Sequence, residues 1–473
     1  MLSDQISFMD LVELTKRIQA KELSSVEVTR HQIDRIDSLD GSLKSFILKT
    51  PELALQQARQ VDDEIMRGEK KGPLHGAPLG IKDLCWVKGV TATGGMPLHA
   101  EFVPREDGTV VRKLRNAGAI FLGMLRMTEG AFADHHPDVP SPVNPWGSSH
   151  WTGVSSSGSG VATAAGLCFG SIGSDTGGSI RFPSVANGLT GLKPTWGLVS
   201  RYGAYELAAT LDHLGPITRT AADAAAMLGA MAGADVKDPT ASLREVPDYL
   251  ATIGDGIRGL RIGIDASWNA RGTDEDTLAM LSGMIGLVTE LGGVVKAIRF
   301  PDETAMIKNW LPLCGVEAAV AHQSTYPAQK LRYGAPMAGL LDLGLRLSAV
   351  DYQRMILDRI SFRGQLDAVF QDIDLILAPA QPIGSPTNDR MKDLGTDPDF
   401  NADMLRFTAP FDMSGHPTIT LPGGLTTEGM PIGFQFVSDH FNESLLFRAA
   451  HAVQQASDWH RRRPAEYLAA SIP

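Results

Sequence analysis

Cysteine and long apolar runs are scarce in this chain. Its 473 residues include three widely spaced cysteines, Cys85, Cys168 and Cys314. These are too few for a disulfide framework and form no Cys-x-x-Cys zinc pattern, so reduced thiols in the cytoplasm are the simplest interpretation. No stretch reaches the roughly 18 uninterrupted apolar residues that a membrane helix needs, and the amphipathic N-terminus lacks a signal-peptide pattern. We therefore expect a cytoplasmic protein without a membrane partner.

An excess of positive charge is missing as well. The chain carries 43 Lys and Arg against 54 Asp and Glu, which gives a formal net charge of −11. Nucleic acids and anionic membranes attract proteins that present a basic surface. The charge balance therefore predicts no nucleic-acid partner.

Several motifs of cofactor enzymes and hydrolases are absent. The sequence has no Gly-Lys dipeptide and so no P-loop, and no G-x-S-x-G nucleophile elbow. One G-x-G-x-x-G string, at 254–259, precedes the strand-like run at 260–264, whereas a dinucleotide site requires it to follow a strand. The pair His135-His136 has no H-E-x-x-H context, so we interpret these histidines as loop or core residues. We expect neither a cofactor nor a metal ion.

Helical and strand-like patterns alternate along the whole chain. The spacing of apolar residues predicts helices within 7–65, 107–118, 161–171, 220–232, 274–291, 305–369 and 443–457. Strand-like apolar runs occur at 119–125, 260–264, 374–380, 416–422 and 431–437. No internal repeat and no long linker divides the chain. We predict one large α/β domain, residues 1–473, with a central mixed, mostly parallel, twisted sheet flanked by helices. Its expected parts are N-terminal helices (1–65), a core with the chemistry (66–220), and the remaining sheet, helices and substrate pocket (221–473).

A glycine- and serine-rich stretch, residues 151–181, stands out against this background. Its centre is apolar and its flanks are structured, which is not typical of a flexible linker. In Asp175-Thr-Gly-Gly-Ser179 the glycines allow successive N–H groups to point into one concavity that holds an anion. A serine at the end of such a turn lies beside its own oxyanion hole, as acyl transfer requires. A serine nucleophile also needs a base.

Three motifs in this region resemble the amidase signature family. They are Gly153-Val-Ser-Ser-Ser-Gly-Ser159, Gly173-Ser-Asp-Thr-Gly-Gly-Ser-Ile-Arg181 and, upstream, Gly80-Ile-Lys-Asp83. The likeness continues through 141–146, 191–203, 211–220 and the C-terminal PIGFQFV and WHRRRP segments, so it covers nearly the whole chain. The combined signature is far more specific than a six-residue string.

The resemblance implies a role for each matching residue. Ser179 corresponds to the nucleophile that forms the acyl-enzyme, Ser155 to the bridging serine after a cis peptide bond, and Lys82 to the base. The backbone of Thr176, Gly177 and Gly178, together with Ser179, corresponds to the oxyanion hole, and Asp175 and Arg181 to structural supports of the site. One departure is Val154, which stands where the family usually has a second glycine.

A lysine base makes a physical demand on its surroundings. Only the neutral amine accepts a proton, so the pKa of Lys82 must fall from about 10.4 toward 7–8. Burial supplies such a shift, and the apolar neighbours Leu79, Ile81 and Leu84 agree with a buried position.

The substrate follows less directly from the sequence. We expect the pocket to draw on the loop 126–137 and the region 305–345, with Trp310, Leu311, Met337 and Leu340 as candidate lining residues. The resemblance implies that the substrate is a linear amide, anilide or carbamate, and we favour a neutral, partly apolar one. Because similar proteins are often homodimers, we also expect this protein to form a homodimer. An alternative is the amidase subunit of a tRNA-dependent amidotransferase. A catalytically inactive binding protein ranks last, because all three catalytic positions are filled.

Overall fold

The computed structural model describes residues 4–394 and 396–467 and contains one continuous sheet of eleven strands. The strand order is β1-β3-β2-β4-β6-β5-β10-β11-β9-β7-β8. The strands are β1 Phe46–Lys49, β2 Pro78–Lys82, β3 Ile120–Leu125, β4 Gly170–Asp175, β5 Thr190–Lys193, β6 His213–Thr218, β7 Arg261–Ile264, β8 Val294–Ala297, β9 Leu375–Pro379, β10 Thr418–Leu425 and β11 Pro431–Ser438. The predicted domain limits 1–3 and 468–473 lie outside the described residues.

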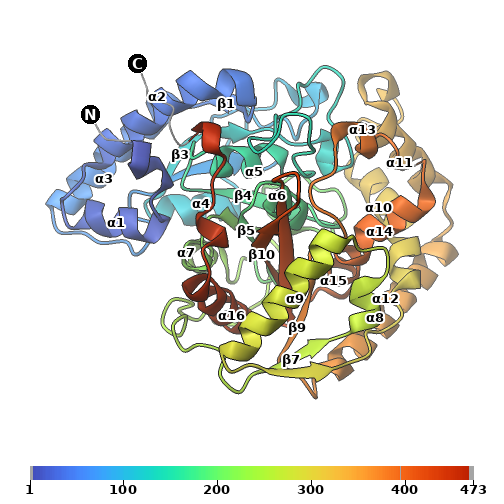
Figure 1. The fold of residues 1–473 in the computed structure, drawn as a ribbon. Coiled ribbons are helices and arrows are strands. Elements are labelled where there is room, and N and C mark those ends of the chain that lie inside the picture. The colour runs from blue at the N-terminus through green and yellow to red at the C-terminus, as the bar shows by residue number, and fades with distance from the viewer. Residues whose placement is uncertain (1–3, 395, 468–473) are drawn as a thin grey trace.

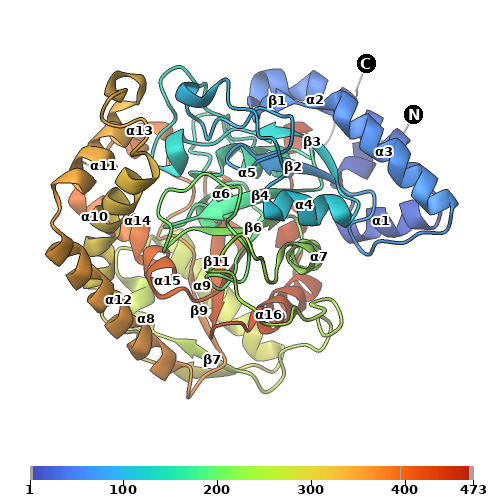
Figure 2. The same cartoon turned by 180° about the vertical axis from the view of Figure 1, so that it is seen from behind.

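Helices surround this sheet (Figures 1 and 2). They are α1 Leu11–Gln19, α2 Ser25–Leu43, α3 Pro51–Met66, α4 Thr109–Asn116, α5 Ser157–Ala164, α6 Arg181–Ala186, α7 Ala221–Met231, α8 Ala266–Ala270, α9 Glu275–Glu290, α10 Thr304–Ala321, α11 Ala335–Arg346, α12 Ala349–Val369, α13 Asn388–Met391, α14 Pro398–Arg406, α15 Ala409–Ser414 and α16 Glu443–Ala456. In both views α1–α3 lie at one side of the molecule and α10–α12 at the other. Among the described helices, none has both the length and the apolar character to cross a membrane.

The sheet is mixed, as predicted, but the expectation that it is mostly parallel is wrong. Within the described residues, six of its ten strand pairings are antiparallel. The pair β10–β11 shows the reason. Only a short turn separates these two strands, and a short turn can connect antiparallel neighbours but not parallel ones. Parallel pairing is confined to β3–β2–β4 and to β8–β7–β9.

The parallel group β3–β2–β4 positions the candidate site. All residues of these three strands are buried, and Leu79 of β2 pairs with Gly170 of β4. Because β2 and β4 are parallel neighbours, their carboxyl ends meet at one edge of the sheet, where α/β proteins place their ligands. Lys82 ends β2 and Asp175 ends β4, so both residues arrive at this edge.

The helix α5 differs from its predicted limits of 161–171. It begins at Ser157, within the glycine-rich segment, and ends at Ala164. Its glycines allow a close approach to neighbouring chain, because a Cβ on Gly158 would lie 2.5 Å from the carbonyl oxygen of Ser45. Gly166 then takes a φ of +69°, a left-handed conformation that ends helices.

Candidate active site

Lys82 lies at the end of β2 with no exposed surface. Its Nζ donates hydrogen bonds to three hydroxyl oxygens: Ser155 Oγ at 2.8 Å, Ser156 Oγ at 2.7 Å and Ser174 Oγ at 2.8 Å. Three acceptors match the three protons of an ammonium group. A neutral amine in the same position has a lone pair, so one of these hydroxyls can donate to it instead.

Burial lowers the pKa of Lys82 to about 7. The nearby charges of Cys85, Asp175 and Asp212 act in the opposite direction and are outweighed. Near neutral pH a large fraction of the amine is therefore uncharged, which meets the demand that a lysine base makes.

Ser155 follows a cis Val154–Ser155 peptide bond and is fully buried. The valine at position 154, where the resembled family usually has glycine, is therefore compatible with a cis peptide bond before Ser155. The carbonyl of Ser155 accepts a hydrogen bond from Thr128 N–H at 3.2 Å. This contact ties the segment around Ser155 to the loop after β3.

The loop from Asp175 to Arg181 is closed by an ion pair without solvent exposure on either side chain. The Asp175 carboxylate accepts from Gly178 N–H at 2.6 Å, from Ile180 N–H at 2.9 Å and from Arg181 Nη2 at 2.8 Å. Although burial opposes ionisation, the guanidinium beside it holds the pKa of Asp175 well below its usual range. Asp175 and Arg181 thus fix the shape of the loop that carries Ser179.

Two glycines in this loop sit where a side chain cannot fit. A Cβ on Gly177 would lie 2.4 Å from the Trp310 ring, and a Cβ on Gly178 would lie 2.3 Å from the Phe182 ring. Gly178 also has a φ of +133°. Its N–H is occupied by Asp175, whereas the N–H groups of Thr176, Gly177 and Ser179 have no acceptor among the described residues.

Ser179 is partly exposed and lines a cavity of about 1200 Å³. Its hydroxyl makes no hydrogen bond to a described residue, including Ser155. Aromatic and aliphatic side chains form much of the surrounding wall: Phe132, Trp151, Val154, Phe182, Leu207, Ile307, Trp310 and Leu311. Trp310 Nε1–H also donates to the Thr176 carbonyl at 2.8 Å, which connects this wall to the serine loop.

The second wall of the cavity was not predicted. It comes from the segment 388–406, which contributes Asn388, Met391, Lys392, Leu394, Pro398, Asn401, Ala402, Asp403, Met404, Leu405 and Arg406. Of the four candidate lining residues, Trp310 and Leu311 line the cavity, whereas Met337 and Leu340 are 1% and 2% exposed and belong to the hydrophobic core. The buried residues of α11 belong to that core, and from this helix only Pro336 is among the lining residues.

A buried polar network beneath the loop was also missed by sequence reasoning. Arg181 Nη2 lies 2.5 Å from Asp412 Oδ2, and His213 Nδ1 lies 3.5 Å from Asp412 Oδ1. Lys193 Nζ lies 3.2 Å from His213 Nε2, and burial lowers the pKa of Lys193 to about 7. These residues come from α6, β5, β6 and α15, and no local motif connects Lys193, His213 and Asp412. His135, from the pair interpreted as loop or core residues, lies in the loop 126–137, lines the cavity and contacts Ser157 Oγ at 3.1 Å.

Comparison with known proteins places this geometry in a family. The Amidase family model matches residues 27–447, and the chain therefore belongs to the amidase family.

Relatives share nearly the full length of the chain. The amidase-family protein AmiD of Mycobacterium tuberculosis is 48% identical over 98% of this chain and 97% of its own. A glutamyl-tRNA(Gln) amidotransferase subunit of Carboxydothermus hydrogenoformans is 33% identical over 97% of this chain and 99% of its own. Among solved structures, the peptide amidase of Stenotrophomonas maltophilia superposes with a TM-score of 0.83 at 29% identity, covering 96% of this chain and 97% of that one.

Proposed function

We propose that this protein hydrolyses a linear C–N amide bond through a seryl acyl-enzyme. In this proposal Ser179 is the nucleophile, Ser155 the bridging hydroxyl and Lys82 the base. The observation that carries it is the buried Lys82 amine, which is hydrogen-bonded to Ser155 beside a cavity lined by Ser179. The lowered pKa of Lys82 supports the role of a base.

In the acylation step, Ser179 Oγ attacks the amide carbonyl carbon as its proton passes to Ser155 and the Ser155 proton passes to neutral Lys82. The carbonyl oxygen becomes an oxyanion, and the unoccupied N–H groups of the 176–179 loop are placed to stabilise it. Gly178 contributes the backbone shape, since its own N–H is bound to Asp175. The proton then returns through Ser155 to the leaving nitrogen, and the C–N bond breaks.

Deacylation repeats these steps with water. Lys82, through Ser155, accepts a proton from the attacking water, and Ser179 leaves with a proton as the carboxylic acid is released. None of these steps draws on a cofactor or a metal ion, so we expect neither to take part.

The cavity favours a substrate that is neutral and partly apolar, such as a primary amide, an anilide or a carbamate. Its aromatic wall next to Ser179 buries apolar groups, and a volume of about 1200 Å³ accommodates more than a small aliphatic amide. Four of the charged lining residues form pairs with one another, Arg271 with Glu303 and Arg406 with Asp403. Such pairs leave less charge free to hold an ionic substrate.

The test is an amide, anilide and carbamate screen on the purified protein, with hydroxylamine present as a competing nucleophile. An acyl-enzyme reacts with water to give the carboxylic acid and with hydroxylamine to give the hydroxamate. Wild type should therefore form both products, and Ser179→Ala should form neither. Ser42→Ala, at an exposed serine near the end of α2, is the matched control. Full activity of Ser179→Ala, or loss of activity in Ser42→Ala, would contradict the proposal.

A second candidate is the amidase subunit of a tRNA-dependent amidotransferase, supported by the full-length match to such subunits. It predicts glutamine as the preferred amide and dependence on a partner chain. Hydrolysis of apolar amides by the isolated protein, without activity on glutamine, would decide against it.

A further inference from the structure

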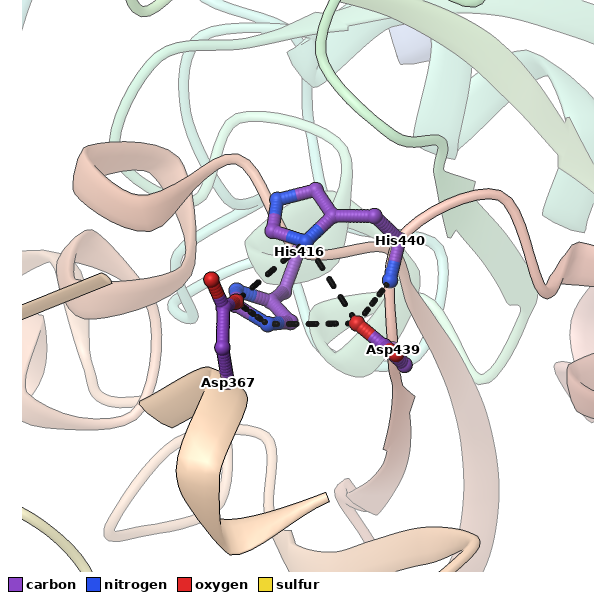
Figure 3. Close-up of side chains that lie close together, drawn as sticks. All are labelled: Asp367, His416, Asp439 and His440. Carbon is purple, nitrogen blue, oxygen red and sulfur yellow. Dashed lines mark hydrogen bonds and ion pairs between the residues drawn. The ribbon is translucent and has the colours of Figure 1, made fainter. Parts of the chain in front are cut away.

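Two histidines and two aspartates form a cluster outside the catalytic cavity (Figure 3). Asp367 lies near the end of α12, His416 lies between α15 and β10, and Asp439 and His440 directly follow β11. None of the four lines the cavity described above. Four side chains of two types that bind divalent cations, histidine and aspartate, therefore converge from three separate segments of the chain.

The spacing of the four ligand atoms suits a small cation. His416 Nε2 lies 3.1 Å from Asp367 Oδ1 and 4.0 Å from Asp439 Oδ1, and His440 Nδ1 lies 3.6 Å from each of the same two oxygens. All four atoms lie within 4.8 Å of one another. Zinc bonds of about 2.0–2.2 Å in a tetrahedron place neighbouring ligand atoms roughly 3.3–3.6 Å apart.

The buried atoms at the centre of the cluster lack other partners. His416 has no exposed surface, and its Nε2 has no hydrogen-bond partner among the described residues. Asp367 Oδ1 is also without a hydrogen-bond partner among the described residues and lies 3.1 Å from His416 Nε2 as an ion pair. Leaving a buried polar atom unpaired is costly, and a shared cation would satisfy both.

Each histidine is held in place through its other ring nitrogen. His440 Nε2–H donates to the Ser414 carbonyl at 3.1 Å, which leaves a lone pair on Nδ1 facing the cluster. His416 Nδ1 contacts Ser414 Oγ at 3.0 Å. Metal-binding histidines use such partners to fix ring orientation and tautomer.

We propose that Asp367, His416, Asp439 and His440 bind a structural Zn²⁺ ion. Two imidazole nitrogens and two carboxylate oxygens complete a tetrahedral shell, and a closed shell marks a structural rather than a catalytic site. The partly exposed side chains of Asp367 and Asp439 give the ion access from solvent.

The site joins the far end of α12 to the ends of β10 and β11, and so connects to the active site. The helix α15 runs between the two: Asp412, in this helix, binds Arg181, and His416 follows two residues after its end. An ion at His416 would therefore hold the element that supports the serine loop.

The test is Zn²⁺ binding by the full-length protein, purified without a metal column and stripped with chelator. Isothermal titration should give one ion per chain, and Co²⁺ should produce the visible absorption of a tetrahedral complex. The thermal midpoint should rise by about 2 °C or more when Zn²⁺ is about a hundred times the Kd.

The variants are Asp367→Asn and His440→Gln, at partly exposed positions that tolerate a change, with His451→Gln on α16 as the control. We expect both ligand variants to bind Zn²⁺ more than about tenfold more weakly and the control to match wild type. Absence of binding, or equal binding by all four proteins, would overturn the proposal. Both results are independent of turnover, and binding measured in Ser179→Ala gives the same answer.

Discussion

The chemistry of single residues begins with the environment of Lys82. Its amine has no contact with solvent and faces three hydroxyls, one of which belongs to Ser155. The same burial that favours the neutral amine also keeps bulk water away from it. One structural cause therefore accounts for both the lowered pKa of Lys82 and its shielding from water.

The pH dependence of turnover should report this amine directly. Burial lowers the pKa of Lys82 from 10.5 to about 7, so the amine is protonated and inactive as a base at lower pH. We expect kcat/KM to fall about tenfold per pH unit below 7 and to level off above it. Lys82→Ala should lower kcat by about 10²–10⁴-fold or more. Rate profiles between about pH 5.5 and 9 would contradict this interpretation if wild type showed no such inflection.

Arg181 is the cation between two buried carboxylates, Asp175 and Asp412. Arg181→Leu removes it and leaves the buried Asp175 charge uncompensated, which should lower the free energy of unfolding by about 3–5 kcal/mol. Arg354→Leu, which breaks an exposed pair with Asp351, should change it by less than about 1 kcal/mol. Urea unfolding measures both variants, and equal effects would show that burial of the Arg181 pairs is unimportant.

Residues joined by local motifs could be predicted from the sequence, and residues joined only by the fold could not. The resemblance brought together Lys82, Ser155 and Ser179, and the structure places the first two in direct contact. Asp412 and His416 escaped notice because their partners are far away in the chain. The sequence around an isolated aspartate or histidine does not show whether that side chain is buried against a distant partner or exposed on the surface.

Among the elements, the loop from Asp175 to Arg181 has little room for added side-chain atoms at its glycines. Gly178→Ala would place a methyl group 2.3 Å from the Phe182 ring at a φ of +133°. Because the loop must shift, the unpaired N–H groups of Thr176, Gly177 and Ser179 lose their positions, and we expect kcat to fall about 100- to 1,000-fold. Gly254→Ala has no neighbouring atom within 4 Å and is the control. Steady-state kinetics that gave similar kcat values for the two variants would rule out this role of the loop.

The longer elements were predicted well, and their arrangement was predicted less well. Apolar periodicity located α4, α7, α9 and α16 to within a few residues. No helix was predicted between the strand-like runs at 374–380 and 416–422, where α13, α14 and α15 lie; α13 and α15, with four and six residues, are too brief to show a helical period. Antiparallel pairing was underestimated because strand direction depends on connections across the whole sheet and not on the strands' own residues.

For the whole molecule, burying two amines lowers the free energy of unfolding by an amount that depends on pH. Lys82 and Lys193 both have a pKa of about 7 in the fold, against 10.5 for the free side chain. Between these values the unfolded chain binds protons that the native chain does not, so each lysine makes stability rise with pH. Below pH 7 both states are protonated and the dependence ends.

Lys82→Met should therefore reduce the slope of unfolding free energy against pH. The expected reduction is about 1.4 kcal/mol per pH unit between about pH 7.5 and 9, the contribution of one proton. Lys193→Met should do the same, and a surface lysine such as Lys296 changed to methionine should have no effect. Urea titrations at several pH values provide the measurement. An unchanged slope in Lys82→Met would mean that its amine stays charged in the fold.

The two walls of the cavity come from distant parts of the gene. Ser179 and the loop that carries it lie before residue 182, whereas the second wall spans 388–406, after nine of the eleven strands. A coding segment of about twenty codons could thus be exchanged between relatives without altering the codons of Lys82, Ser155 or Ser179. We expect such an exchange, by recombination or by grafting in the laboratory, to change the range of substrates and to leave these three residues in place.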